Sequence, residues 1–253
     1  MKNNVVISIQ NVSKTFNSQG TPLKVLDNVS FDVYDQEFVC IIGYSGCGKS
    51  TLLRIIAGME TADSGGVYMD GQLHSSPNEN VILLFQDYNQ LFPWKTVINN
   101  IIHPLLATKR AKNKEEAHSK GMELLKRVGL SEYANYYPHQ LSGGMRQRAA
   151  IARALSLEPK VLLMDEPLSA LDDVTRKALR ELIRDVCSQC NVTTICVTHS
   201  VEEAIIMGTR IVAMNRHTHT IEKIIENTAY DRQDDANARF RMRTEITDFM
   251  ASQ

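Results

Sequence analysis

The sequence lacks any apolar run of the roughly 18 to 20 residues that span a bilayer. Its N-terminal cluster, residues 5–7, is also too short for the apolar region of a signal peptide. An excess of charge is missing as well, because 28 lysine and arginine residues nearly balance 29 aspartate and glutamate residues. Without an excess of positive charge, the chain has no general electrostatic attraction to nucleic acid or to an anionic membrane. These absences predict a soluble, intracellular protein.

Cysteine is scarce and odd in number, which argues against a disulfide framework. Cys187 and Cys190 have the CxxC spacing, but a zinc site would need a second pair of ligands and none stands nearby in the sequence. Two reduced thiols on a helix are the simpler interpretation, and a redox role is the alternative. The remaining cysteines are Cys40, Cys47 and Cys196.

Repeats, low-complexity tracts and Pro/Gly/Ser-rich linkers are absent too, so the 253 residues predict one domain. Alternating patterns at residues 5–9 and 29–33 predict strands with one buried face, in an antiparallel arrangement around a turn at 17–22. Continuous apolar runs predict strands that helices cover on both faces, as in a parallel α/β core. These runs are residues 38–42, 161–164 and 194–197.

Between the first two runs, a polar amphipathic pattern from about residue 109 to residue 128 predicts a helix in an inserted helical lobe. A terminal helix is expected near residues 241–250. The fold class is therefore α/β, with an N-terminal antiparallel layer and an inserted helical subdomain. We expect a core at about 1–87 and 158–215, the helical subdomain at about 88–157, and a C-terminal appendage at about 216–253.

Residues 43–51 have the pattern G-x-x-x-x-G-K-[ST] of a phosphate-binding loop, between an apolar strand and a helical segment. Glycines let backbone N–H groups approach a phosphate chain without Cβ clashes. Lys49 is expected to reach the β and γ phosphates, and Ser50 to offer its hydroxyl to Mg²⁺. A glycine-rich turn with an incidental lysine is the alternative, which the flanking strand and helix disfavour. The predicted nucleotide-binding residues are Gly43, Tyr44, Ser45, Gly46, Cys47, Gly48, Lys49, Ser50 and Thr51.

Cys47 lies inside this loop, close to a predicted helix N-terminus. A helix N-terminus favours the thiolate of a nearby cysteine. We therefore expect a reactive thiol at Cys47 that bound ATP protects from alkylation.

Two carboxylates follow the apolar run 161–164. Asp165, at the predicted strand tip, is expected to hold Mg²⁺ through water. Glu166 is expected to orient and deprotonate the attacking water, a role that contributes about 10²- to 10⁴-fold in rate. Because an acidic turn after a buried strand is common, the phosphate loop is what favours this interpretation.

Residues 141–148, Leu-Ser-Gly-Gly-Met-Arg-Gln-Arg, closely resemble the signature of the ATP-binding cassette family. A serine and two glycines there precede a predicted helix at 145–157 and make a second anion-binding end. The resemblance implies that two chains pack head to tail. Each ATP would then lie between Lys49 of one chain and the signature of the other, formed by Ser142, Gly143 and Gly144.

The same resemblance covers the chain to about Met214 and assigns roles to further residues. Phe16 matches the aromatic residue that stacks on adenine, with an ordinary core phenylalanine as the alternative. Gln86 matches the glutamine that senses Mg²⁺ and the attacking water, with a capping polar residue as the alternative. His199 matches the switch histidine that contacts the γ phosphate, and Asp172 belongs to a dimer-contact loop at 169–172. The resemblance thus implies catalytic roles for Lys49, Gln86, Glu166 and His199, and magnesium ligands at Ser50, Gln86 and Asp165.

Residues 91–97 contain the only tryptophan, next to a proline and a phenylalanine. In similar importer subunits this region lines a groove that receives a helix of the permease, although a core anchor is the alternative. The Phe92-Pro93-Trp94 pattern resembles the nitrate, sulfonate and taurine importer group, whereas residues 168–169 and 215–219 depart from that group.

The resemblance therefore implies the ATP-hydrolysing subunit of an importer, with ATP and Mg²⁺ as cofactors. It implies a homodimer, or a dimer with a paralogous cassette, at the cytoplasmic face of the membrane. The expected contact with a multi-span permease is the Gln86 to Val97 region, and a substrate-binding protein would act indirectly.

Two other functions remain open. A soluble cassette ATPase acting on DNA or ribosomes would share the motifs, but the long coiled coil or second cassette of those proteins is missing, and no nucleic acid partner is expected. A small-molecule kinase would share the phosphate loop, but leaves the signature at 141–148 and His199 without a role.

Overall fold

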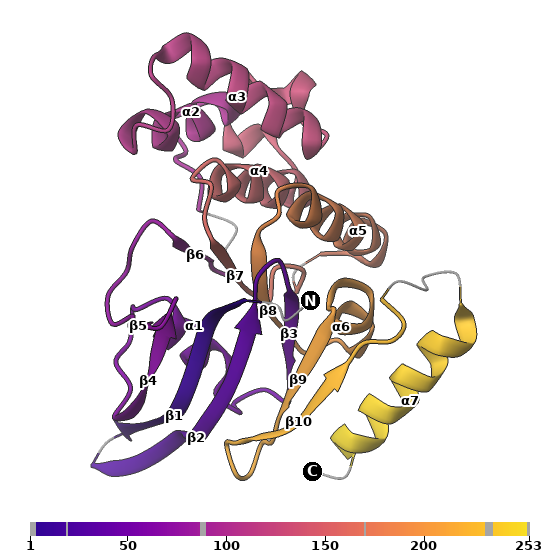
Figure 1. The fold of residues 1–253 in the computed structure, drawn as a ribbon. Coiled ribbons are helices and arrows are strands. Elements are labelled where there is room, and N and C mark those ends of the chain that lie inside the picture. Colours follow the sequence, from indigo (N-terminus) through magenta and orange to yellow (C-terminus); the bar gives the residue numbers. More distant parts are fainter. Residues whose placement is uncertain (1–3, 19, 87–89, 170, 231–234, 252–253) are drawn as a thin grey trace.

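The computed structural model describes residues 4–18, 20–86, 90–169, 171–230 and 235–251, which form two β-sheets and a helical layer (Figure 1). The first sheet is antiparallel with the strand order β2-β1-β4-β5. The paired strands β1 and β2 are longer than the alternating pattern predicted, so the turn-rich stretch at 17–22 lies mostly within them. The strands are β1 (Val5–Ser18), β2 (Thr21–Tyr34), β4 (Ser64–Met69) and β5 (Gln72–Leu73).

The second sheet has the order β10-β9-β3-β8-β7-β6 and is parallel except for β10 at its edge. Each residue of β3, β7, β8 and β9 is buried, which confirms the prediction that the continuous apolar runs form covered parallel strands. The segment 216–253, expected as an appendage, contributes β10 to this sheet. The strands are β3 (Phe38–Ile42), β6 (Val81–Leu84), β7 (Val161–Asp165), β8 (Thr193–Thr198), β9 (Arg210–Met214) and β10 (Ile221–Glu226).

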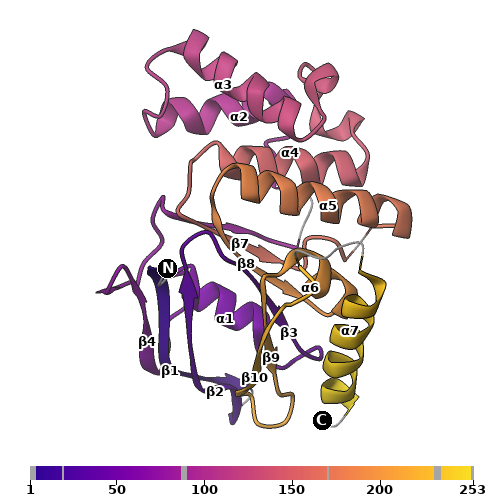
Figure 2. The same ribbon diagram turned by 45° about the vertical axis from the view of Figure 1, so that its right-hand side comes forward.

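Helix α1 (Lys49–Ile56) lies between the two sheets (Figure 2). Successive side chains of a strand point to opposite faces, and β3 illustrates the result. Val39 and Ile41 pack with α1 and the first sheet, whereas Cys40 and Ile42 pack in the core under the outer helices. Strand β3, which leads into the phosphate loop, is therefore anchored in both cores.

The helical lobe consists of α2 (Val97–Ala107), α3 (Lys114–Arg127) and α4 (Gly143–Leu155), with two short 3₁₀ turns between α3 and α4. The helix expected from residue 109 begins only at Lys114, because the Asn113 side chain caps it by accepting the N–H of Glu116 at 2.8 Å. Helix α4 begins at Gly143, two residues before the predicted start, because Ser142 is its N-cap.

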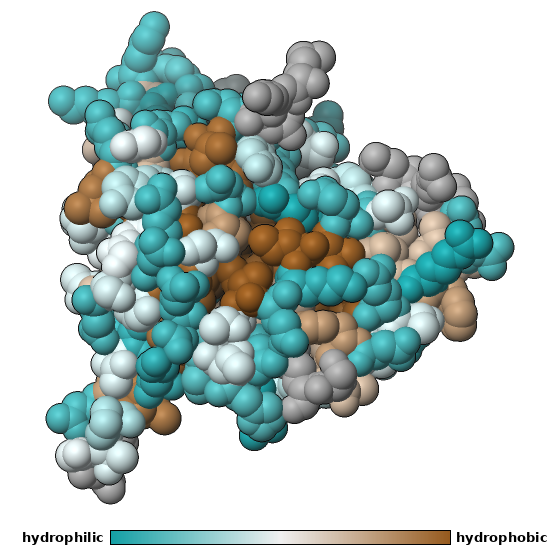
Figure 3. All heavy atoms as spheres, turned by 60° about the horizontal axis from the view of Figure 1, so that its bottom comes forward, coloured by the Kyte–Doolittle hydropathy of each residue, from teal (hydrophilic) through white to brown (hydrophobic). Residues whose placement is uncertain are grey.

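Helices α5 (Asp173–Gln189) and α6 (Val201–Met207) cover the parallel sheet, and α7 (Ala236–Ala251) packs against α6. The terminal helix thus begins five residues before the predicted start. On the face in Figure 3, hydrophobic side chains gather toward the middle and hydrophilic side chains surround them. Among the described residues, the structure contains no helix with the length and apolar character needed to cross a bilayer.

Candidate nucleotide and catalytic site

The loop between β3 and α1 curves around a lysine side chain. Lys49 is buried, and its Nζ donates hydrogen bonds to the carbonyl oxygens of Gly43 at 2.8 Å and Tyr44 at 2.9 Å. A Cβ on Gly48, which has a φ of 101°, would lie 2.3 Å from the Val25 carbonyl oxygen. This position requires glycine, since a side chain would clash with β2 and disfavour the left-handed backbone. Gly48 therefore lets the loop pack closely against β2 where it enters α1.

The prediction of a reactive thiolate at Cys47 is wrong. The side chain is fully buried, and burial raises the pKa of its thiol, although the nearby Lys49 ammonium acts in the opposite direction. The cysteine Sγ lies 3.8 Å from Lys49 Nζ. Desolvation outweighs the favourable charge here, because the whole thiol lies inside the packed loop.

Ser50 and Asp165 are 115 residues apart in the chain and meet at the end of β7. The Ser50 hydroxyl donates to Asp165 Oδ1 at 2.9 Å. Burial raises the pKa of Asp165, and the neighbouring Glu166 carboxylate adds to this rise. A hydroxyl and a carboxylate held side by side are oxygen donors of the kind that Mg²⁺ accepts, so these residues fit the predicted metal.

Glu166 and His199 lie together at the ends of the adjacent strands β7 and β8. The His199 Nδ1 atom is 3.3 Å from Glu166 Oε2. Glu166 has a φ of 44°, and its N–H donates to the Val197 carbonyl oxygen at 3.0 Å, which holds the residue against β8. This strained turn directs the carboxylate toward the histidine instead of continuing the strand.

Gln86 joins the same cluster through Ser169. The Gln86 Nε2 atom donates to Ser169 Oγ at 3.2 Å, and Ser169 Oγ donates to the Glu166 carbonyl oxygen at 3.1 Å. The structure therefore brings Gln86, Glu166 and His199 to one edge of the sheet. The dimer-contact loop at 169–172 includes residue 170, which lies outside the described residues, as do residues 87–89 of the predicted permease contact.

Phe16 is not a core residue, because 38% of it is exposed. It pairs with Leu23 in the first sheet, two residues from the Val25 carbonyl that touches the phosphate loop. Lys14 Nζ lies 5.1 Å from the centre of its ring. This position beside the loop suits an exposed aromatic face, and stacking on adenine stays a prediction.

The signature residues open α4 in the helical layer, whereas the phosphate loop lies between the sheets. The Ser142 hydroxyl accepts the Met145 N–H at 3.3 Å. A Cβ on Gly144 would lie 2.5 Å from Thr175 Cγ2 of α5, so the two helix ends approach closely. Asp172 caps α5 by accepting the Thr175 N–H at 3.0 Å, and this bond lowers the pKa of its carboxyl. Ser142 and Asp172 are both exposed.

A groove of about 310 Å³ runs between β6 and α4 and is lined mainly by apolar side chains. Beside it, Trp94 is 71% exposed and stacks on Phe92 with ring centres 5.5 Å apart. The Arg153 guanidinium lies 4.2 Å from the Phe92 ring centre and donates to the Gln90 carbonyl oxygen. The segment 91–97 therefore combines both interpretations, since Leu91 and Val97 are buried in the core while Trp94 is mostly exposed.

An ion pair near His199, between a buried carboxylate and a partly exposed arginine, was not predicted from the sequence. Glu203 of α6 is 5% exposed and accepts a hydrogen bond from the Thr198 hydroxyl. Its Oε1 atom lies 4.0 Å from Nε of Arg176, which belongs to α5. Burial raises the pKa of Glu203, while the nearby His199, Arg176 and Arg180 lower it. An acidic residue between the apolar residues of a short helix was the available signal, but sequence does not reveal its partner.

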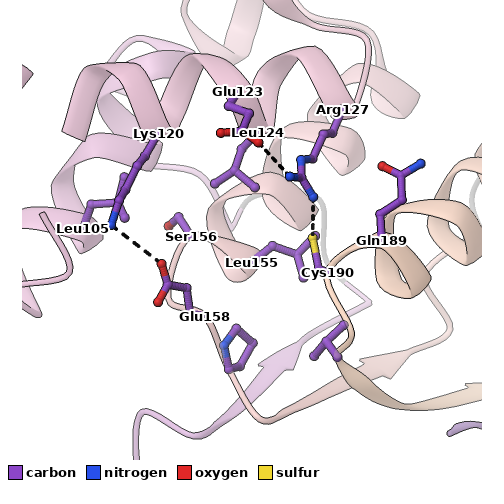
Figure 4. Close-up of a pocket in the computed structure, with 12 residues that line it drawn as sticks. Leu105, Lys120, Glu123, Leu124, Arg127, Leu155, Ser156, Glu158, Gln189 and Cys190 are labelled. Atoms are coloured by element: carbon purple, nitrogen blue, oxygen red, sulfur yellow. Dashed lines mark hydrogen bonds and ion pairs between the residues drawn. The ribbon is translucent and has the colours of Figure 1, made fainter. Parts of the chain in front are cut away.

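The CxxC cysteines lie apart from this site. Cys187 is buried in α5, and burial raises the pKa of its thiol to about 12. Cys190 lines a cavity of about 390 Å³ between α3 and the end of α5, where Arg127 Nη1 lies 3.5 Å from its sulfur (Figure 4). Within the described ranges, no cluster of three or more His, Cys, Asp or Glu side chains could hold a metal ion. Cys187 and Cys190 are free cysteines at the C-terminal end of α5.

Comparisons with known proteins agree with this geometry. The sequence profile of the ABC transporter family matches residues 26–169. The nitrate import ATP-binding protein NrtD of Synechococcus elongatus is 39% identical over 94% of this chain and 89% of its own length. The aliphatic sulfonates import ATP-binding protein SsuB of Bacillus thuringiensis is 41% identical over 96% of this chain and 94% of its own. Among solved structures, a dimeric structure of MJ0796, a bacterial ABC transporter cassette, is 33% identical with a TM-score of 0.77, covering 88% of this chain and 100% of that chain.

Proposed function

Since this chain belongs to the ABC transporter family and is an ATPase, we propose that it is the energy-coupling subunit of an importer that works as a head-to-tail dimer. In each dimer, ATP would lie between the loop at Lys49 of one chain and Ser142 to Gly144 of the other. The separation of these segments into different layers of one chain supports a site completed by a second copy, and so does the dimeric cassette structure that resembles it. A paralogous cassette in place of the second copy would satisfy the same geometry.

The reaction would take place where β7 and β8 end. Ser50, Asp165 and Gln86 would hold Mg²⁺, which neutralises the charge that builds on phosphoryl oxygens during transfer. Glu166 would accept the proton of the attacking water, and His199 would contact the γ phosphate while its Nδ1 stays near Glu166. The single observation that carries the proposal is the meeting of Ser50 with Asp165 and of Glu166 with His199 at one sheet edge.

The groove between β6 and α4, with the exposed Trp94 beside it, would receive a helix of a multi-span permease. This contact would hold the subunit at the cytoplasmic face of the membrane, and a substrate-binding protein would act on the permease alone. The transported solute would be nitrate, a sulfonate, taurine or a similar small molecule, because the similar proteins are named for nitrate and aliphatic sulfonates.

The test is capture of the tagged Glu166→Gln protein with ATP from detergent-solubilised cells, followed by mass spectrometry. This substitution keeps ATP binding, removes the proton acceptor and should accumulate an ATP-bound dimer together with a multi-span membrane protein. Capture with ADP in place of ATP is the control, and it should not accumulate the ATP-bound dimer. Recovery of ribosomal or DNA-bound partners alone would contradict the transporter function. Near-normal ATP hydrolysis by the Glu166→Gln protein would show that Glu166 is not the proton acceptor.

A further inference from the structure

Beyond the proposed catalytic residues, a buried network ties the backbone around His199 to the loop that follows Glu166. We propose that Arg176 and Glu203 act as a brace that positions these two segments as one unit, so that hydrolysis responds to the partner chain at the dimer-contact loop. The proposal rests on the proposed roles of Glu166 and His199. Both members of the brace are positioning residues, because neither is placed against the nucleotide.

The first half of the brace holds His199. The Glu203 carboxylate accepts the Thr198 hydroxyl, and that hydroxyl oxygen accepts the N–H of Ser200 at 3.0 Å. The residues on both sides of His199 are thereby connected to one buried carboxylate. The imidazole itself is 58% exposed and meets Glu166 at 3.3 Å, so its placement depends on this held backbone.

The second half holds the loop after Glu166. Arg176 donates from Nη2 to the Leu171 carbonyl oxygen at 2.5 Å and from Nε to that of Leu168 at 3.4 Å. Between these two residues lies Ser169, whose hydroxyl contacts Glu166 and Gln86. One guanidinium therefore fixes two carbonyls of the segment that connects the catalytic carboxylate to the dimer-contact loop.

The two halves meet at the pair of Arg176 Nε and Glu203 Oε1, 4.0 Å apart. Burying a carboxylate without a cation costs folding free energy, and Arg176 of α5 supplies a cation to Glu203 of α6. The guanidinium donates from Nε, Nη2 and Nη1 to Leu168, Leu171 and Asp173 respectively, an arrangement of donors that a lysine ammonium does not reproduce. Movement of the loop at Leu171 would shift Arg176, then Glu203, and then the backbone of His199.

The first experiment removes a single hydroxyl. Thr198→Val keeps the side-chain shape but removes the hydroxyl that links the Ser200 N–H to the Glu203 carboxylate. We expect a kcat lower by about 10-fold or more, since small displacements of reacting groups can cost about 100-fold. The KM for ATP should stay within about twofold of the original, because the phosphate loop is untouched. Thr198→Ser should restore kcat. Thr194→Val is the matched control, since the hydroxyl of this buried threonine of β8 donates to the Val192 carbonyl oxygen. This variant should lose stability without losing kcat.

The second experiment tests the loop half and does not depend on how Thr198→Val folds. Arg176→Lys keeps the charge but cannot span the same carbonyls, so we expect a lower kcat and a loss of cooperativity. Two linked sites allow a Hill coefficient for ATP of up to about 2, and the variant should approach about 1. If both Thr198→Val and Arg176→Lys keep kcat and cooperativity while His199→Ala loses activity, the brace is refuted and the proposed function stands. If His199→Ala keeps full activity, the role of His199 and the brace fail together.

Discussion

The exposed Trp94 gives the sharpest test of the permease contact. Burial of a whole tryptophan removes about 150 to 250 Å² from water. Because 71% of Trp94 is exposed, roughly 110 to 180 Å² remains for a partner to cover, which at about 25 cal/mol per Å² is about 2.8 to 4.5 kcal/mol. A tenfold change in affinity corresponds to about 1.4 kcal/mol, so Trp94→Ala should weaken permease binding about 100- to 1,000-fold.

The same substitution should leave the isolated subunit nearly intact. Its main loss is the stack on Phe92, worth about 0.5 to 1.5 kcal/mol. For a chain of this size each kcal/mol shifts Tm by about 2 to 4 °C, so Tm should fall by no more than about 6 °C. ATP hydrolysis by the isolated protein should not change, because Trp94 lies beside the β6–α4 groove and not at the ends of β7 and β8, where the reaction is proposed to take place.

The assay is titration of the labelled subunit against the solubilised membrane protein recovered with Glu166→Gln. Phe240→Ala is the matched control, because Phe240 is 69% exposed but lies on α7. The control should bind as the original protein does. A change of less than about threefold for Trp94→Ala, or equal losses in both variants, would refute the docking of a permease helix at this groove, since about threefold is only about 0.7 kcal/mol.

Two further predictions follow from buried titratable groups. Burial raises the pKa of Asp165, so the stability that its proton contributes is complete below the unfolded pKa and is lost as the pH rises through the folded pKa. Asp165→Asn should therefore raise Tm at pH 7. The gain in Tm should disappear near pH 4, because a free aspartate takes up its proton at about 3.9. The variant should not hydrolyse ATP, and an equal gain in Tm at both pH values would contradict the raised pKa of Asp165. For Cys47, burial and the raised pKa predict slower alkylation than for the partly exposed Cys190, with further slowing by ATP. Mass spectrometry of the labelled peptides measures both rates, and identical Cys47 labelling with and without ATP would show that the nucleotide does not cover this loop.

The phosphate loop and the signature were predictable because each is a contiguous segment whose chemistry depends on neighbours in the chain. Glycine spacing, the strand before Gly43 and the helix after Lys49 are local features. Apolar runs likewise revealed buried parallel strands, since covered strands need no polar face. The exact length of β1 and the start of α3 were missed, because strand pairing and the Asn113 cap override the local pattern.

Sequence by itself thus determined the family motifs and the class of fold, whereas the tertiary structure decided which distant residues meet. The order β3-β8-β7 sets the end of β7 beside that of β8, and so brings Glu166 to His199 and Ser50 to Asp165. It also buries Glu203 beside Arg176 and Arg180 of another helix, and it exposes Trp94. Local periodicity carries no information on strand order or on the burial of a charge, because both arise only when separate segments pack against one another.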